Sequence, residues 1–294
     1  MRKLRDPRWV TKVILLLTLR RRLLLSAWGG AGGVSVGVSM TRALGAVGRK
    51  FRSLGIDCEE GLQALLPLVK VKGSISRGAD IVATGGSTHC STVLLNGTAC
   101  RYKVTESGRR QIFTFQYPGD FCDLNRYVLA ESDDAVAALS ECSVGVIRHE
   151  DLERITRQYP DMGRALWRNV MVEASIFREW LLNVGQRPAL ARIANLICEQ
   201  MVRLDAVGID GTVIPLTQVD LADAAAVSPV HMNRTVQDLR ELGILARSSR
   251  YIEVVHRDRL VDIAKFDGRY LNIHQTASQW GPPRWMSREA APLH

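Results

Sequence analysis

The stretch LTQVDLADAAAVSPVHMNRTVQDLREL, residues 216–242, contains the start signals of two helices that follow each other closely. Thr217 can cap the first helix, and Asp220, three residues later, completes a capping box. Ser228 can cap the second helix, where Pro229 suits the first position because its missing N–H is not needed there. Two helices joined by a short turn within about 26 residues are typical of a DNA-binding helix-turn-helix.

The second helix of this pair has an apolar side and a polar side. Met232, Val236 and Leu239 recur at helical spacing and are expected to be buried. The opposite side has one cation, two amides and, within residues 229–237, no acid. Arginine can bond guanine O6 and N7 together, asparagine or glutamine can bond adenine N6 and N7, and valine can meet a thymine methyl. We therefore predict that base edges are read by Pro229, Val230, Asn233, Arg234 and Gln237.

The segment after this helix predicts a wing. ILARSSRYIEVV, residues 244–255, reads as a β-hairpin, and RDRLVDIAKF, residues 257–266, as a closing helix. Two helices and a turn also occur in plain helical proteins, where Arg234 would be a solvated surface charge, but the wing favours DNA binding. Residues beside helix N-termini and basic residues of the wing can bond phosphate oxygens. The predicted phosphate contacts are Thr217, Gln218, Ser228, His231, Arg247 and Arg250.

Regular turn signals precede this region in the chain. They recur every eight to eleven residues, at Arg77-Gly78, Gly85-Gly86, Asn96-Gly97, Ser107-Gly108 and Pro118-Gly119, with short apolar stretches between them. This spacing predicts an antiparallel β-roll of the jelly-roll kind. Asn96-Gly97 and Ser107-Gly108 are the best candidates for hairpin turns.

A long helix is predicted between the β-roll and the helix-turn-helix. Residues 148–185 show no strand alternation, and the helix should end near Gly185, with Pro188 just beyond. A coiled-coil-like stripe, interrupted by Glu173, predicts a helix that pairs with its twin in a homodimer. The alternative is a helix packed on its own barrel. The predicted dimer residues are Leu166, Val170, Phe177, Trp180 and Val184.

The positive charge of the chain is concentrated at its N-terminus. The 294 residues have a net charge of +9, but residues 1–52 contain 12 Lys/Arg and one acid, so the remainder is slightly acidic. The net charge is therefore no argument for DNA binding. The first 39 residues have three interpretations: an export signal or membrane-surface segment, a disordered basic arm, or a start codon placed too early, with Met40 as the true start.

The six cysteines show no metal or cluster spacing, which predicts reduced thiols in a cytosolic protein. Redox sensing through Cys122 or Cys142 is the alternative.

The whole pattern resembles the Crp/Fnr family of bacterial transcription regulators, over roughly residues 55–268. The family's recognition helix opens with Ser and has an Arg six residues later, here Ser228 and Arg234. The resemblance implies an α+β fold with a β-roll sensor domain, a long dimerisation helix and a winged helix-turn-helix. The expected parts are a basic extension over 1–50, disordered or wrongly assigned to the chain, a cyclic-nucleotide-binding-like sensor over 51–158, a dimerisation helix over 159–187, a DNA-binding domain over 188–270 and a tail over 271–294.

The sensor half departs from the cyclic-nucleotide-binding members of that family. After Gly119-Asp120-Phe121, the phosphate-binding residues are replaced, and Asp133-Asp134 stands where an Arg and a hydroxyl residue are expected. Two carboxylates would repel a phosphate by about 1 kcal/mol each, so we expect no cyclic AMP. Cys58 stands alone near the N-terminus, which argues against an iron–sulfur cluster; haem ligation by His89 or Cys90 stays open. We predict no cofactor and no metal, and the effector is unknown.

These observations together predict a cytoplasmic, homodimeric transcription regulator that binds palindromic double-stranded DNA. RNA polymerase is an expected partner if the protein is an activator. An enzyme is not expected, because no nucleophile elbow, zinc motif or nucleotide-binding loop is found. The alternative function is a membrane-attached or exported binding protein that uses the N-terminal segment and keeps the winged helix for protein contacts.

Overall fold

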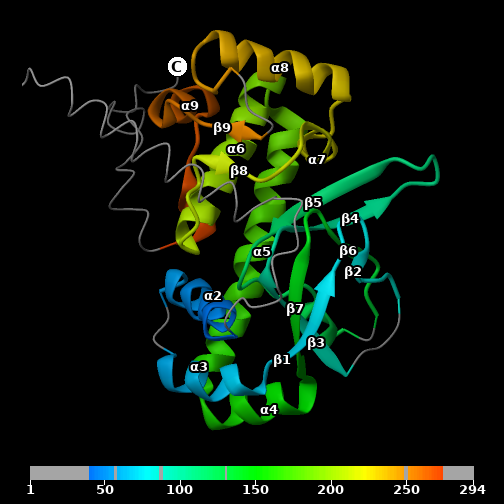
Figure 1. Ribbon diagram of the computed structural model, residues 1–294, viewed down its shortest axis with the longest axis vertical. Helices are drawn as coiled ribbons and strands as arrows, with labels where there is room; N and C mark the ends of the chain where they lie inside the picture. Colours follow the sequence, from blue (N-terminus) through cyan, green and yellow to red (C-terminus); the bar gives the residue numbers. More distant parts are fainter. Residues whose placement is uncertain (1–39, 56–57, 86–88, 130, 248–250, 274–294) are drawn as a thin grey trace, which may run out of the picture. The chain divides into compact units, whose positions relative to one another are not determined.

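The computed structural model describes residues 40–55, 58–85, 89–129, 131–247 and 251–273 (Figure 1). Two helices and a short 3₁₀ turn come first: α2 (Met40–Ser53), α3 (Glu59–Leu65) and η1 (Leu66–Leu68). Residues 40–50 were predicted to belong to a disordered or wrongly assigned extension, and the prediction of disorder is wrong for α2. Its Val47 and Phe51 are buried in a cluster with Leu62 of α3, so hydrophobic packing holds the helix.

The β-roll consists of two antiparallel sheets, as predicted. One has the order β1-β7-β3, and the other β2-β6-β4-β5. The strands are β1 (Lys70–Ile75), β2 (Asp80–Val82), β3 (Cys90–Asn96), β4 (Ala99–Val104), β5 (Arg110–Gln116), β6 (Ala135–Ala138) and β7 (Cys142–Arg148), with the 3₁₀ helix η2 (Leu124–Tyr127) before β6.

Of the two predicted hairpin turns, one is confirmed. Ser107-Gly108 joins β4 to its partner β5, and Gly108 has φ +76°. Asn96-Gly97 does not make a hairpin, because β3 and β4 belong to different sheets. Gly97 has φ +94°, and a Cβ there would lie 2.5 Å from the carbonyl oxygen of Glu141, so glycine is needed where the chain passes between the sheets.

A helical region follows the β-roll. Its helices are α4 (His149–Gln158), α5 (Pro160–Gln186) and α6 (Ala189–Ala206). The predicted end near Gly185 is confirmed, because α5 stops one residue later and Pro188 is already the N-cap of α6. α5 is long enough to cross from the β-roll to the C-terminal region, where α6 contacts it (Figure 1).

The predicted dimer stripe on α5 is wrong at two positions. Leu166 and Trp180 are buried within their own chain: Leu166 belongs to the cluster around Phe51, while Trp180 packs on Phe115 of β5 and donates a hydrogen bond from Nε1 to Glu199 Oε2 at 2.8 Å. Val170 and Val184 are half-buried, and Phe177 is exposed. The more strongly exposed apolar side chains lie mostly one residue further on, at Trp167, Met171, Leu181 and Leu182.

The C-terminal region carries the predicted winged helix-turn-helix. Its elements are β8 (Val213–Ile214), α7 (Gln218–Ala225), α8 (Pro229–Glu241), β9 (Ile252–Glu253), α9 (Arg257–Ala264) and the 3₁₀ helix η3 (Gly268–Leu271). β9 pairs with β8, and Leu245 pairs with Val254, so the base of the wing is a small antiparallel sheet.

The first helix of the pair contacts the β-roll directly. Arg110 of β5 donates from Nε to Asp223 Oδ2 at 2.8 Å and from Nη2 to Asp220 Oδ1 at 2.9 Å. Gln111 Nε2 lies 3.4 Å from the carbonyl oxygen of Ala224. β5 therefore holds α7 through ion pairs as well as through packing.

Candidate nucleic-acid interface

The helix-turn-helix is built from local cap chemistry. Thr217 and Asp220 form the predicted capping box: Thr217 Oγ1 accepts from the Asp220 amide at 3.2 Å, and Asp220 Oδ2 accepts from the Thr217 amide at 3.2 Å. Ser228 caps α8, with its Oγ accepting from the His231 amide at 3.2 Å. Both predicted helix starts are confirmed.

The turn between the helices depends on a left-handed residue. Ala226 ends α7 with φ +52° and ψ +46°, a conformation that costs a side chain with a Cβ about 1–2 kcal/mol. The chain then reverses, and the Val227 amide donates to the Ala222 carbonyl at 3.1 Å. Ala222, Ala224 and Ala225 are buried, and their small side chains allow α8 to approach α7.

α8 has the predicted two sides. Met232, Val236 and Leu239 are fully buried, and the five predicted base-reading residues are all exposed, Val230 by 81%. Arg234 has no charged or hydrogen-bonding partner among the residues that the structure describes, so its guanidinium is available to a ligand. The residues on the exposed side of α8 therefore do not contribute to the hydrophobic core of the protein.

Two acids limit this surface. Asp238 and Glu241 line the same shallow groove as Val230, Arg234 and Gln237. Carboxylates repel phosphate and can bond only donors such as cytosine N4. The surface suited to bases and phosphates is thus the first two turns of α8.

Gln218, at the start of α7, lies beside the reading side of α8. Its Oε1 accepts a hydrogen bond from Asn233 Nδ2 at 3.2 Å. Gln218 was predicted to contact phosphate; its oxygen instead accepts from a predicted base-reading side chain, and this bond does not use the Asn233 oxygen or the Gln218 amide group.

The other predicted phosphate contacts have different surroundings. Thr217 donates its hydroxyl to Asp220 Oδ2 at 2.6 Å and its amide to the same oxygen, so both donors are used within the cap and the basis for its phosphate contact is lost. Ser228, His231 and Arg247 are exposed, and their contacts with phosphate stay predictions. Arg250 lies outside the described residues.

Ion pairs in the β-roll occupy the position where an anionic ligand would bind in the cyclic-nucleotide-binding relatives. Arg101 of β4, which is 4% exposed, contacts Asp134 at 3.0 Å, Glu173 of α5 at 3.3 Å and the carbonyl oxygen of Cys122 at 2.9 Å. Asp133 pairs with Lys103. The two aspartates are therefore neutralised, and the predicted repulsion is weaker than expected. A phosphate would instead have to displace carboxylates from an occupied, buried arginine.

The cysteines proposed as redox sensors are fully buried. Burial raises the pKa of the Cys122 thiol well above its ordinary value, and it also raises the pKa of Cys142. Since the thiolate is the reactive form, both residues are poor targets for oxidants. Within the described residues, no group of three or more His, Cys, Asp or Glu side chains is arranged to hold a metal ion.

Residues 73–159 match the family described as cyclic nucleotide-binding domain, and residues 191–263 match the family described as Crp-like helix-turn-helix domain. The chain is 26% identical to the transcriptional activator protein FnrL of Cereibacter sphaeroides over 227 residues, which cover 74% of this chain and 90% of that protein. It is 25% identical over 193 residues to a probable transcriptional activator of Rhizobium leguminosarum bv. viciae, covering 65% and 80% of the two chains.

Among solved structures, FixK2 from Bradyrhizobium japonicum has the same fold. Its TM-score is 0.59 at 23% identity, and the match covers 66% of this chain and 96% of that one. Among the described residues, no helix is both long and apolar enough to cross a membrane.

Proposed function

Since this chain belongs to the Crp/Fnr family of transcription regulators and carries a DNA-binding helix-turn-helix, we propose that it acts as a homodimer on palindromic operators. Each copy would place α8 in a major groove, and the two grooves would lie one helical turn apart. The observation that carries the proposal is the exposed side of α8, whose Arg234 and Gln237 face away from the protein's own core.

Exposed apolar side chains on α5 support the proposed dimer. Trp167, Met171 and Leu181 are exposed on one helix, and Leu181 is exposed by 75%. Large apolar side chains that gather on one exposed surface are typical of a protein–protein interface. A second copy of α5 would cover them and bring the two reading helices into a two-fold arrangement.

Regulation in this proposal does not use cyclic AMP. Arg101 is already bound by two carboxylates and a carbonyl, so the sensor offers no free cation at that position to a cyclic phosphate. The effector is of another class, or the protein acts without one, and no cofactor is needed. The protein would work in the cytoplasm and contact RNA polymerase if it activates transcription.

The test is selection of bound fragments from random double-stranded DNA by the purified full chain, followed by footprinting. We expect a two-fold symmetric site. Replacing Arg234 with Ala should cost about 1–3 kcal/mol of specific binding and relax one position in each half-site. Arg154→Ala, at an exposed arginine of α4 remote from α8, is the matched control and should bind as the wild type does. Unselective binding by the wild type would refute the proposed function.

A further inference from the structure

Helix α2 lies outside both family-matched regions and yet contacts residues of each. Phe51 packs edge-on against Phe121 in the turn after β5, with ring centroids 6.2 Å apart. Gly119 in the same turn is so close to α2 that a Cβ would lie 2.6 Å from the Ala46 carbonyl oxygen. α2 is therefore seated tightly on the β-roll.

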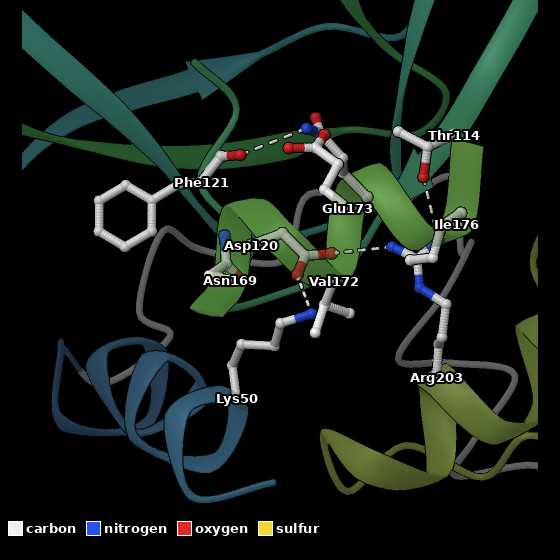
Figure 2. Close-up of a pocket in the computed structure, with 10 residues that line it drawn as sticks. Lys50, Thr114, Asp120, Phe121, Asn169, Val172, Glu173, Ile176 and Arg203 are labelled. Atoms are coloured by element: carbon white, nitrogen blue, oxygen red, sulfur yellow. Dashed lines mark hydrogen bonds and ion pairs between the residues drawn. The ribbon is translucent and has the colours of Figure 1, made fainter. Parts of the chain in front are cut away.

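Asp120 connects α2 to the DNA-binding region. Figure 2 shows Lys50 of α2 and Arg203 of α6 reaching this carboxylate from different elements. Lys50 Nζ lies 2.6 Å from Oδ1, and Arg203 Nη2 lies 3.3 Å from Oδ2. Burial by itself would raise the pKa of Asp120, but the two cations hold it below its ordinary value. The carboxylate thus stays ionised and bonded to both helices.

Arg203 is held in place from several sides. It donates from Nη2 to the carbonyl oxygen of Phe115 at 2.7 Å, and from Nη1 to Thr114 Oγ1 at 3.1 Å. It also pairs with Glu199, which is fully buried and accepts from Tyr270 at 2.7 Å. Removing any charge from this network would leave a buried charge without its full set of partners.

A second connection joins α2 to the end of α6. Arg49 Nε donates to the carbonyl oxygen of Val207 at 2.7 Å, just after the last turn of α6. Lys50 and Arg49 are adjacent in sequence, so one turn of α2 is bonded through Asp120 to Arg203 and directly to the residue that follows α6. α6 packs against both α7 and α8, so the angle of α6 determines where the reading helix lies.

We propose that Lys50, together with Arg49, is a positioning residue for DNA recognition: by fixing α6 to the β-roll it sets the half-site spacing that the dimer accepts. This rests on the proposed function, because spacing has meaning only for a dimer with two reading helices. A rigid dimer binds half-sites at one separation. A dimer whose DNA-binding domains move freely would bind half-sites at several separations.

The experiment compares operators whose half-sites have the selected spacing with operators lengthened or shortened by one or two base pairs. The wild type should prefer the selected spacing strongly. Lys50→Met should reduce this preference by about twofold to thirtyfold, the range found for mutations that alter coupling between sites. Lys50→Arg, which keeps the charge, should retain it. Lys72→Met, at an exposed lysine of β1, is the matched control and should also retain it.

The spacing preference is a ratio, so a loss of folded protein alone does not change it. Arg49→Met, which breaks the second connection, gives an independent measurement if Lys50→Met does not fold. A wild type without any preferred site would overturn the proposed function. A wild type with strict spacing, matched by equally strict Lys50→Met or Arg49→Met proteins, would overturn the role of α2 alone.

Discussion

At the scale of single residues, the conformation of the turn matters as much as the reading side chains. Ala226 holds the left-handed conformation that reverses the chain between α7 and α8. Glycine adopts this conformation without the clash that a Cβ causes. The alanine therefore stores strain at the point where the two helices meet.

Replacing Ala226 with Gly should raise the free energy of unfolding by about 1 kcal/mol. The measurement is urea unfolding of the full chain followed by circular dichroism. Ala191→Gly, within the right-handed helix α6, is the control and should lower the free energy of unfolding by about 0.5–1 kcal/mol. An unstable Ala226→Gly protein would show that the Cβ makes contacts that outweigh its strain.

The hydrogen bond between Gln218 and Asn233 is a second feature of this scale. Replacing Gln218 with Ala frees the Asn233 amide to rotate, so we expect the preference at one base position of each half-site to weaken by about 1 kcal/mol. Sequence selection with Gln218→Ala, Asn233→Ala and the double variant measures it. If Gln218 acts by orienting Asn233, the double variant should resemble Asn233→Ala; additive losses would instead indicate an independent contact with DNA.

At the scale of elements, the sequence predicts where helices begin, but it does not always predict which strands pair or which side of a helix is buried. Thr217, Ser228 and Pro229 predicted both helix starts, because caps are formed by residues close in sequence. Asn96-Gly97 was predicted to close a hairpin, but pairing of β3 with β7 depends on residues far along the chain. On α5, the side that packs on the β-roll and the exposed side are adjacent around the helix. The spacing of apolar residues therefore assigned Trp180 to the dimer interface, although it is buried against Phe115.

The exposed side of α5 leads to a prediction about assembly. Leu181→Glu would place two charges within the proposed interface, where truncating a hot-spot side chain typically costs about 2 kcal/mol or more. We expect sedimentation at micromolar concentration to find a dimer for the wild type and a monomer for this variant. Val128→Glu, at an equally exposed apolar residue in the turn after η2, should remain dimeric. A dimeric Leu181→Glu protein would place the interface elsewhere.

At the scale of the whole molecule, buried charges connect elements that are distant in sequence. Neither Lys50 nor Arg203 was singled out from the sequence, because an ion pair between residues so far apart leaves no periodic pattern. Even α2 was missed, since its basic residues made it resemble a solvated arm. The partner of Lys50 is Asp120, in the turn after which the family resemblance places the phosphate-binding residues.

The lowered pKa of Asp120 makes a prediction about acid stability. A carboxylate whose pKa is lower in the folded state stabilises the protein above its unfolded pKa, about 3.8, and this contribution is lost as the pH falls through the folded value. The free-energy difference between wild type and Asp120→Asn should therefore be constant from pH 7 to about pH 5 and shrink below about pH 4. Urea unfolding across this range measures it; a difference independent of pH would exclude the ionised carboxylate as its source.

The ion pairs of Arg110 with Asp220 and Asp223 have a consequence for chimaeric regulators. Fusing this sensor to the DNA-binding half of a relative at Arg187-Pro188 would give a continuous chain, but β5 would then face a helix with other side chains. Unless the grafted helix carries acids at both positions, a partly buried guanidinium loses its counter-ions. A hybrid of this protein will therefore need the contacting residues of β5 and α7 to be redesigned together. Joining the two halves at Arg187-Pro188 is not enough.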